Sequence, residues 1–159
     1  MTLLDVVTAL LSAGLCSEPC EYWDALSRAE MIADACGEDG DPWEWPSGDD
    51  CKLLLVAVWH AETAGTLAER PTYRGTGSGP GQVVAGRLWT TRTGDVWTPS
   101  RLELEEPAVG LRWAVELLRW KAWRLGTRNP AMVLRAYNAS DAADAYVARA
   151  MRVLVRAGR

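Results

Sequence analysis

The sequence predicts a mainly α-helical single domain with one irregular segment or small hairpin between its helices. Apolar residues recur at helical spacing along most of the 159 residues, whereas residues 71–99 are dense in Gly, Thr and Pro. Apolar residues make up 48% and charged residues 24% of the chain, which are ordinary globular values and argue against extensive disorder. We therefore expect one domain over residues 1–159, with an N-terminal helical extension at 1–49 and a core at 50–156.

The first part of the chain is expected to hold three helices. Apolar side chains recur every three or four positions in residues 2–14 and 21–36, which predicts two of them. A loop follows, and Asp49 or Asp50 is expected to cap the third helix, at residues 51–64.

The second half is expected to begin irregularly and then to become helical. We expect a short helix at residues 83–87 and a hairpin around 93–95. A long helix is expected at 107–125, because Pro stands at its start and Gly follows its end. An Asn-Pro pair opens another helix at 129–137, and the last is expected at 141–157.

The charge of the chain is unevenly distributed. The formal net charge is −4, but residues 1–66 carry 13 acidic and 2 basic side chains, whereas residues 67–159 carry 8 acidic and 15 basic ones. Two packed halves that neutralise each other are the simpler interpretation, and a basic face toward an anionic polymer is the alternative. The acidic total is atypical of DNA-binding domains, so we expect no nucleic-acid partner.

The sequence also bears on the location of the protein. The longest uninterrupted apolar run, residues 53–59, is too short to cross a bilayer, so no membrane span is expected. The N-terminus has no Lys or Arg before its apolar stretch, and Asp5 interrupts that stretch. We therefore expect a mature helix there and not a signal peptide, which leaves the compartment open.

The four cysteines, Cys16, Cys20, Cys36 and Cys51, all lie in the first third of the chain. Only the first two are close together, and His60 is the single histidine, so neither a zinc site nor another cofactor is expected. One or two disulfides, with three full pairings, and four buried thiols both remain open.

The most distinctive single residue is Glu62, at the expected end of the third helix. Leu55, Val58, Trp59 and Glu62 share one helical face, so the carboxylate follows three large apolar side chains. Desolvation and the negative end of the helix dipole should both raise its pKa, as a general acid requires. The alternative is a glutamate that emerges into solvent at the helix end.

Several short motifs follow one another in residues 50–156. They are Glu62-Thr63 after an apolar helix, Gly79-Pro80-Gly81-Gln82, Tyr137-Asn138 at a helix end, and Tyr146-Val147 in the last helix. In this order they resemble the Slt-type lytic transglycosylases of glycoside hydrolase family 23, in the lysozyme superfamily. Thr63 stands where that family has Ser, Pro80-Gly81 where it has Leu-Met, and the Gly expected soon after Tyr-Asn is absent. The resemblance implies a lysozyme-like domain with 50–156 as its catalytic core.

A weaker resemblance is to family 19 chitinases and related endolysins. His60-Ala61-Glu62-Thr63 is similar to the His-Glu-Thr motif of that family, and Tyr73-Arg74-Gly75 with residues 79–82 is similar to its Tyr-Gly-Arg-Gly-Pro-x-Gln motif. The inserted Ala61 and the shorter spacing count against it. Both resemblances imply that Glu62 is the general acid.

The first resemblance implies cleavage of the peptidoglycan glycan strand between N-acetylmuramic acid and N-acetylglucosamine. A lytic transglycosylase needs only Glu62, whereas a hydrolase needs a second carboxylate, for which Glu69 and Asp95 are the candidates. Without the resemblance, Tyr137 would be read as a core side chain and Asn138 as a left-handed helix end. The residues expected to bind the substrate are Thr63, Gly79, Gln82, Tyr137 and Asn138.

Two non-enzymatic alternatives remain. The chain can be a lysozyme-like structural or binding component of a phage or secretion assembly, or an unrelated helical interaction domain. An enzyme without a signal peptide would reach the cell wall by holin release, virion carriage or dedicated secretion. The retained Glu62 favours the enzyme, with peptidoglycan glycan strands as its partner.

Overall fold

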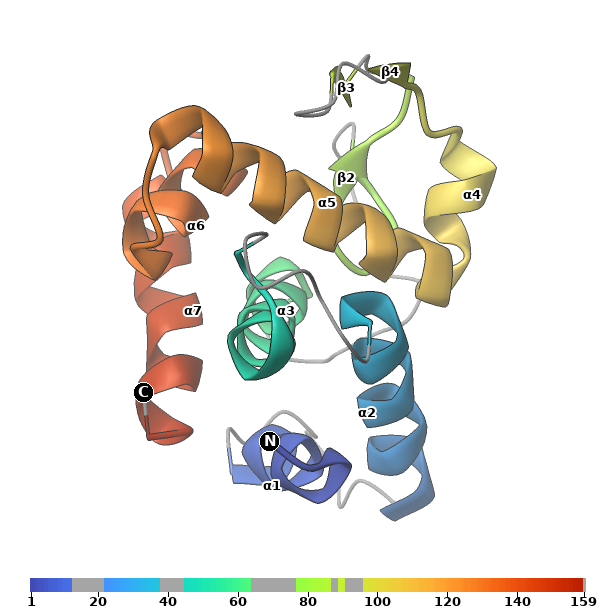
Figure 1. Cartoon of the computed structure of the whole chain (residues 1–159), viewed down its shortest axis with the longest axis vertical. Helices are drawn as coiled ribbons and strands as arrows, with labels where there is room; N and C mark the ends of the chain where they lie inside the picture. Colours follow the sequence, from blue (N-terminus) through green and yellow to red (C-terminus); the bar gives the residue numbers. More distant parts are fainter. Residues whose placement is uncertain (13–21, 38–44, 64–76, 87–88, 91–95, 159) are drawn as a thin grey trace.

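The computed structural model describes residues 1–12, 22–37, 45–63, 77–86, 89–90 and 96–158 (Figure 1). These residues form a mainly α-helical structure with two small antiparallel sheets of two strands each. In chain order the elements are α1 (Leu3–Ser12), α2 (Tyr22–Cys36), α3 (Gly48–Glu62), β1 (Gly77–Ser78), β2 (Val83–Val84), β3 (Trp89–Thr90), β4 (Val96–Trp97), α4 (Arg101–Glu105), α5 (Pro107–Leu125), α6 (Pro130–Asn138) and α7 (Ala143–Arg156).

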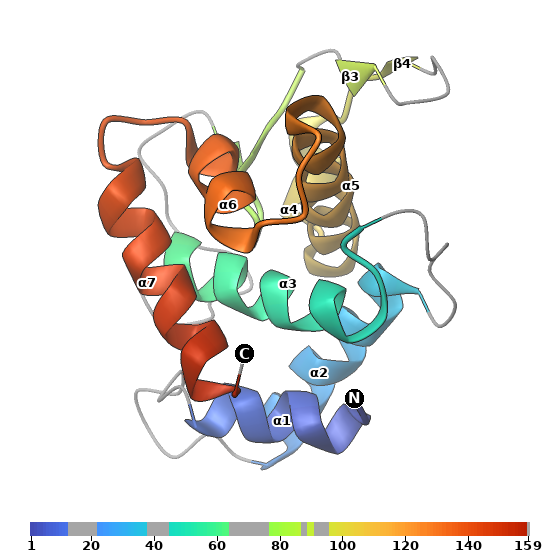
Figure 2. The ribbon, with the colours of Figure 1, turned by 60° about the vertical axis from the view of Figure 1, so that its left-hand side comes forward.

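Helix α3 lies at the centre of the structure. Cys51, residues 53–59 and Ala61 are all buried, so the helix is covered on every side and not along one stripe. Helices α1, α2, α5 and α7 pack around it (Figures 1 and 2). The C-terminal end of α3, where Glu62 stands, is therefore fixed by the whole core.

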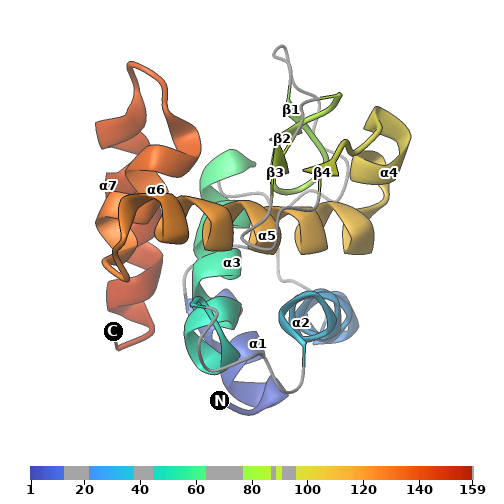
Figure 3. The same ribbon diagram turned by 45° about the horizontal axis from the view of Figure 1, so that its top comes forward.

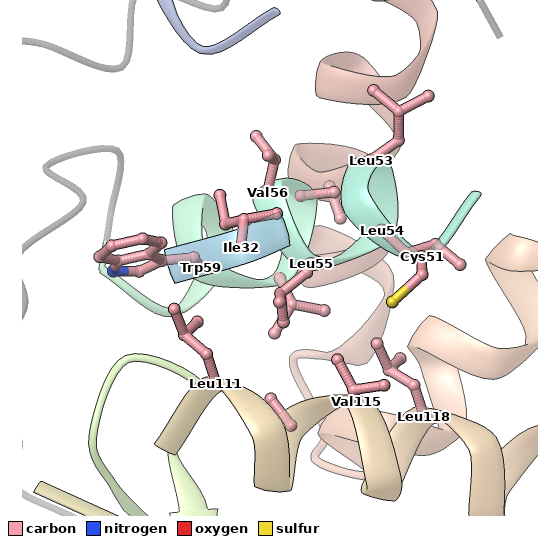
Figure 4. Close-up of a cluster of buried hydrophobic side chains, with 14 of the residues drawn as sticks. Ile32, Cys51, Leu53, Leu54, Leu55, Val56, Trp59, Leu111, Val115 and Leu118 are labelled. Carbon is pink, nitrogen blue, oxygen red and sulfur yellow. The ribbon is translucent and has the colours of Figure 1, made fainter. Parts of the chain in front are cut away.

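One cluster of the core joins α3 to α2 and α5 (Figure 4). Trp59 is fully buried, and Ile32 from α2 and Leu111 and Leu118 from α5 are also fully buried in the same cluster. This contact holds the acidic first part of the sequence against the basic second part. On the other side of α5 lie the two hairpins and α4 (Figure 3).

The C-terminal helices follow the local signals in the sequence. Helix α5 begins at Pro107, and Gly126, whose φ of 61° and ψ of 33° are left-handed, caps its C-terminal end. The side chain of Asn129 caps α6 by accepting hydrogen bonds from the backbone N–H groups of Ala131 and Met132. The boundaries expected for both helices are thus confirmed to within a residue.

The middle of the chain differs from the expectation. The helix predicted at 83–87 is wrong, because Val83 and Val84 form β2, which pairs with Ser78 and Gly77 of β1. β3 pairs with β4, in agreement with a hairpin around 93–95, although those turn residues lie outside the described ones.

The sequence analysis also differs from the structure at α4 and at the start of α3. Helix α4 was not predicted; Ser100 and Glu103 form a reciprocal capping box at its start. Helix α3 is preceded by Ser47, with no side-chain cap, and not by Asp49 or Asp50.

A disulfide joins the last residue of α2, Cys36, to the first turn of α3 at Cys51. Both side chains are buried, at 2% and 0% exposure. This pairing decides between the alternatives for these two cysteines, while Cys16 and Cys20 lie outside the described residues.

Replacing both Cys36 and Cys51 with Ala should lower the free energy of unfolding. The sequence separation is 15 residues, and a loop of that size contributes about 3 kcal/mol by restricting the unfolded chain. Urea unfolding of the oxidised protein and of the double variant measures the difference. A reducing agent should lower the stability of the wild type toward that of the variant. Equal stability of the two proteins under oxidising conditions would contradict the prediction.

In the described part of the chain, no helix is both long and apolar enough to cross a membrane.

Candidate active site

Glu62 is the last residue of α3 and is largely covered by its surroundings. Burial raises the pKa of its carboxyl group from 4.5 to about 7, because desolvation disfavours the charged form. A hydrogen bond from Tyr146 and the positive charge of Arg149 lower the pKa by smaller amounts. The sequence prediction of a desolvated carboxyl group is confirmed, and the carboxyl group exchanges its proton near neutral pH.

Thr63 ends the helix directly after Glu62. Its backbone N–H and its hydroxyl both donate to the carbonyl oxygen of Trp59, at 3.0 and 2.7 Å. The residue is 6% exposed. The hydroxyl therefore fixes the helix end that carries Glu62, and the expected contact with substrate stays a prediction.

Two tyrosines from different helices lie beside Glu62. The rings of Tyr137 in α6 and Tyr146 in α7 stack with their centroids 6.5 Å apart and their planes 9° from parallel. Burial raises the pKa of both phenols well above 10, and the negative charge of Glu62 adds to the effect. Both rings are therefore neutral groups that can donate a hydrogen bond at any physiological pH.

The two hydroxyls have different partners. Tyr137 donates to the carbonyl oxygen of Gly81 at 2.6 Å, which ties α6 to the first hairpin. The Tyr146 hydroxyl is buried and has no partner at ordinary hydrogen-bond geometry. It nevertheless acts on the carboxyl group of Glu62, with a geometry that falls outside that of an ordinary hydrogen bond.

The loop of the first hairpin, residues 79–82, is pressed against α4 and α5. Gly79 has a φ of 70°, and a side-chain carbon there would overlap the carbonyl oxygen of Leu104. A carbon added at Gly81 would meet the Ala114 side chain at 2.5 Å and the Tyr137 hydroxyl at 3.0 Å. Both glycines are therefore required for the seating of the loop next to Tyr137.

Gln82 has a strained backbone and an unsatisfied side chain. Its φ is 49°, a left-handed value that is uncommon for a residue other than glycine. The side-chain Nε2 donates to the carbonyl oxygen of Gly79 at 2.8 Å, while Oε1 is buried without a partner. The amide is thus held in one orientation with an acceptor available.

Unsatisfied polar atoms gather in this region. In the described part of the chain, four buried side-chain atoms lack a hydrogen-bond partner: Nδ1 of His60, Oε1 of Gln82, the hydroxyl of Tyr146 and Nε of Arg149. Such atoms are costly, and each requires an explanation such as a catalytic role, a ligand or a bound water. All four belong to the last turn of α3 or to the elements that hold Gln82, Tyr137 and Tyr146.

The structure brings together part of the predicted site. Glu62, Tyr137 and the 79–82 loop form one connected group. Tyr137 is both a buried side chain, with 8% exposure, and a neighbour of Glu62. Asn138 accepts hydrogen bonds from the backbone and hydroxyl of Ser140, so its carbonyl oxygen is used locally. Ala139, with a φ of 48°, and not Asn138, adopts the left-handed conformation at the end of α6.

The candidate second carboxylates, Glu69 and Asp95, lie outside the described residues. Tyr146 and Arg149 were not among the predicted site residues. Two signals in the sequence were available for these residues. One is the Tyr146-Val147 motif, and the other is the spacing of three residues between Tyr146 and Arg149, which puts both on one face of α7. No group of three His, Cys, Asp or Glu side chains that could hold a metal ion occurs among the residues described.

Comparison of the chain with protein-family models, curated proteins and solved structures gave no match. The geometry around Glu62 is therefore the basis for assigning a function.

Proposed function

We propose that this protein cleaves the glycan strand of peptidoglycan between N-acetylmuramic acid and N-acetylglucosamine, as a lytic transglycosylase in a lysozyme-like fold. The observation that carries the proposal is the buried Glu62 with a pKa of about 7 at the end of a rigid core helix. A carboxylic acid of this pKa can give a proton and take one back at neutral pH.

In the proposed reaction Glu62 first protonates the glycosidic oxygen, and the bond to C1 of the muramoyl residue breaks. The resulting carboxylate then removes the proton of the muramoyl 6-hydroxyl, whose oxygen bonds to C1. The products are a 1,6-anhydromuramoyl end and a new 4-hydroxyl on N-acetylglucosamine, without consumption of water. One carboxyl group is sufficient for both steps.

The surrounding residues support these steps. The neutral Tyr146 hydroxyl lies near Glu62 and stabilises its carboxylate form by a hydrogen bond. The free Oε1 of Gln82 can accept a hydrogen bond from the acetamido N–H of a sugar. Tyr137 holds the Gln82 loop in place through its bond to Gly81.

The product ends test the proposal directly. The purified protein is incubated with sacculi of several peptidoglycan types, and the soluble fragments are analysed by mass spectrometry, with the Glu62→Gln variant as the blank. Anhydro ends that depend on Glu62 are expected. Hydrated reducing ends would instead indicate a hydrolase that uses Glu69 or Asp95, and no fragments from a folded sample would favour the structural or binding alternative.

Tyr146→Phe should shift the pH dependence of cleavage. The hydrogen bond from Tyr146 lowers the pKa of Glu62, so its removal should raise that pKa and move the alkaline limb of kcat/KM to higher pH. Soluble glycan strands assayed from pH 5 to pH 9 provide the profile. Tyr137→Phe is the comparison, because it breaks a 2.6 Å hydrogen bond and should chiefly lower stability. An unchanged alkaline limb in Tyr146→Phe would contradict the prediction.

A further inference from the structure

A group of basic side chains lies where α7 crosses the last turns of α3. Arg149, Arg152 and Arg156 are spaced three and four residues apart and therefore follow one face of α7. All three act on His60 of α3, whose pKa is lowered first by burial and then by their positive charges. Arg149 also acts on Glu62 and Tyr146. The cluster thus extends from the catalytic carboxyl group along α7.

Two members of this basic cluster, Arg149 and Arg152, lack an ion pair within the described part of the chain. The Nε atom of Arg149 is buried and has no hydrogen-bond partner, and no ion pair is formed by Arg149 or Arg152 with the described residues. On α7 itself, Asp144 pairs with Arg135 of α6. The charge of Arg149 acts on the carboxyl group of Glu62.

The acidic groups on the other elements packed against α7 have their own partners. The Asp5 carboxylate of α1 accepts from Thr2, and the Asp49 carboxylate of α3 pairs with the N-terminal ammonium group. Asp50 of α3 accepts from the indole N–H of Trp45 at 3.3 Å. The Nε–H of Arg149 has no acceptor, which leaves the guanidinium group under-satisfied. Because the Arg149 side chain as a whole is only partly buried, a ligand that supplies an anionic oxygen to its accessible part would be favoured.

We propose that Arg149 and Arg152 form a subsite that binds a carboxylate of the peptide stem attached to the muramoyl residue being cleaved. The inference rests on the proposed function. The sugars of a strand with intact stems are neutral, whereas the stem carries free carboxylates. It joins the strand through the lactyl group of the muramoyl residue, on the same sugar ring whose C1–O bond is cleaved. A guanidinium group matches a carboxylate by two parallel hydrogen bonds, and the charge of Arg149 also acts on Glu62.

The test compares three forms of the same glycan strand. They are strands with intact stems, strands stripped of stems by an amidase and then treated with methylamine to block the lactyl carboxylates that the amidase frees, and strands whose stem carboxylates have been amidated with methylamine. The proteins are the wild type, Arg149→Gln, Arg149→Lys and Arg152→Gln. Arg128→Gln is the matched control, because Arg128 is an exposed arginine outside the cluster. The readout is kcat/KM for anhydro-end formation at several pH values.

On intact strands, Arg149→Gln should lower kcat/KM about tenfold. Arg152→Gln and Arg149→Lys should lower it less, and Arg128→Gln should leave it unchanged. On stripped and amidated strands, the wild type and Arg149→Gln should be nearly equal at matched protonation of Glu62. This comparison separates carboxylate binding from the effect of Arg149 on the pKa of Glu62, because the pKa effect acts on all three substrates.

Two results would overturn the subsite: an equal loss on intact and stripped strands, or no loss on intact strands. A binding measurement keeps this failure distinct from a failure of the proposed function. The Glu62→Gln variant should bind intact strands more tightly than stripped ones, and adding Arg149→Gln should remove the difference. If the wild type cleaves none of the strands while this difference is present, the subsite stands and the catalytic proposal falls; if the difference is absent, the subsite falls.

Discussion

Glu62→Gln is expected to lower cleavage of peptidoglycan by about 10²- to 10⁴-fold, the range for removal of a general acid or base. Glutamine has nearly the same shape but cannot give the glycosidic oxygen a proton. Fragments released from sacculi by wild type and variant, quantified at equal protein concentration, measure the loss. Because α3 is held by the core around it, far-UV circular dichroism should be unchanged. Cleavage retained by a folded variant would remove Glu62 from the mechanism.

The same substitution should also change the pH dependence of stability. The folded pKa of Glu62 is about 7, against an ordinary value of 4.5, so the folded state binds the proton more tightly than the unfolded state does. The contribution of the protonated Glu62 to the free energy of unfolding is fully present below about pH 4.5 and is lost as the pH rises to about 7. The loss amounts to up to about 3 kcal/mol. Glutamine stays neutral throughout.

Urea unfolding at pH 5 and pH 8 tests this linkage. The variant should be more stable than the wild type by less than about 1 kcal/mol at pH 5 and by about 3 kcal/mol at pH 8. Groups other than residue 62 affect both proteins alike and cancel in the comparison. A variant that is less stable than the wild type at pH 8 would mean that Glu62 is not desolvated as the structure has it.

Gly79→Ala should have the second large effect, on both stability and activity. A left-handed φ of 70° disfavours Ala, and its side-chain carbon would overlap the carbonyl oxygen of Leu104, which is backbone and cannot rotate away. We expect a loss of about 3 kcal/mol or more in the free energy of unfolding, from left-handed strain and overpacking together. The displaced loop should also carry Gln82 out of position and reduce cleavage.

Gly86→Ala is the matched control. Gly86 has the same φ of 70°, but a carbon added there meets nothing within 4 Å. It should therefore show only the backbone cost, about 1 to 2 kcal/mol, and should leave cleavage intact. Thermal or urea unfolding of the two variants isolates the contact with Leu104, and equal losses would show that the loop is not pressed against α4.

The elements that could be predicted from the sequence are those with local signals. Pro107, Gly126 and Asn129 act within one helical turn, and α5 and α6 follow them closely. The hairpin of β1 and β2 was missed because its turn is set by a distant contact, that of Gly79 with Leu104. Two consecutive valines gave no indication of that contact.

The candidate site divides in the same way. Glu62 was identified because its apolar neighbours lie on its own helix, one and two turns away. Tyr146 and Arg149 were missed because their closeness to Glu62 depends on how α7 crosses α3, which no local pattern encodes. Gln82 was predicted from a motif, but its left-handed backbone was not, since Pro80-Gly81 departs from the motif of the resembling family.

The covalent link between α2 and α3 has a consequence for how the protein can be modified. Ile32 from α2 belongs to the cluster around Trp59, and Cys36 ties the same helix to the start of the helix that ends in Glu62. The position of the Glu62 carboxyl group thus depends on a segment that lies before the motif-bearing region in the sequence. A chimaera that contains residues 50–156 alone would expose the apolar face of α3 that α2 covers. A transferable form of this site therefore has to include α2.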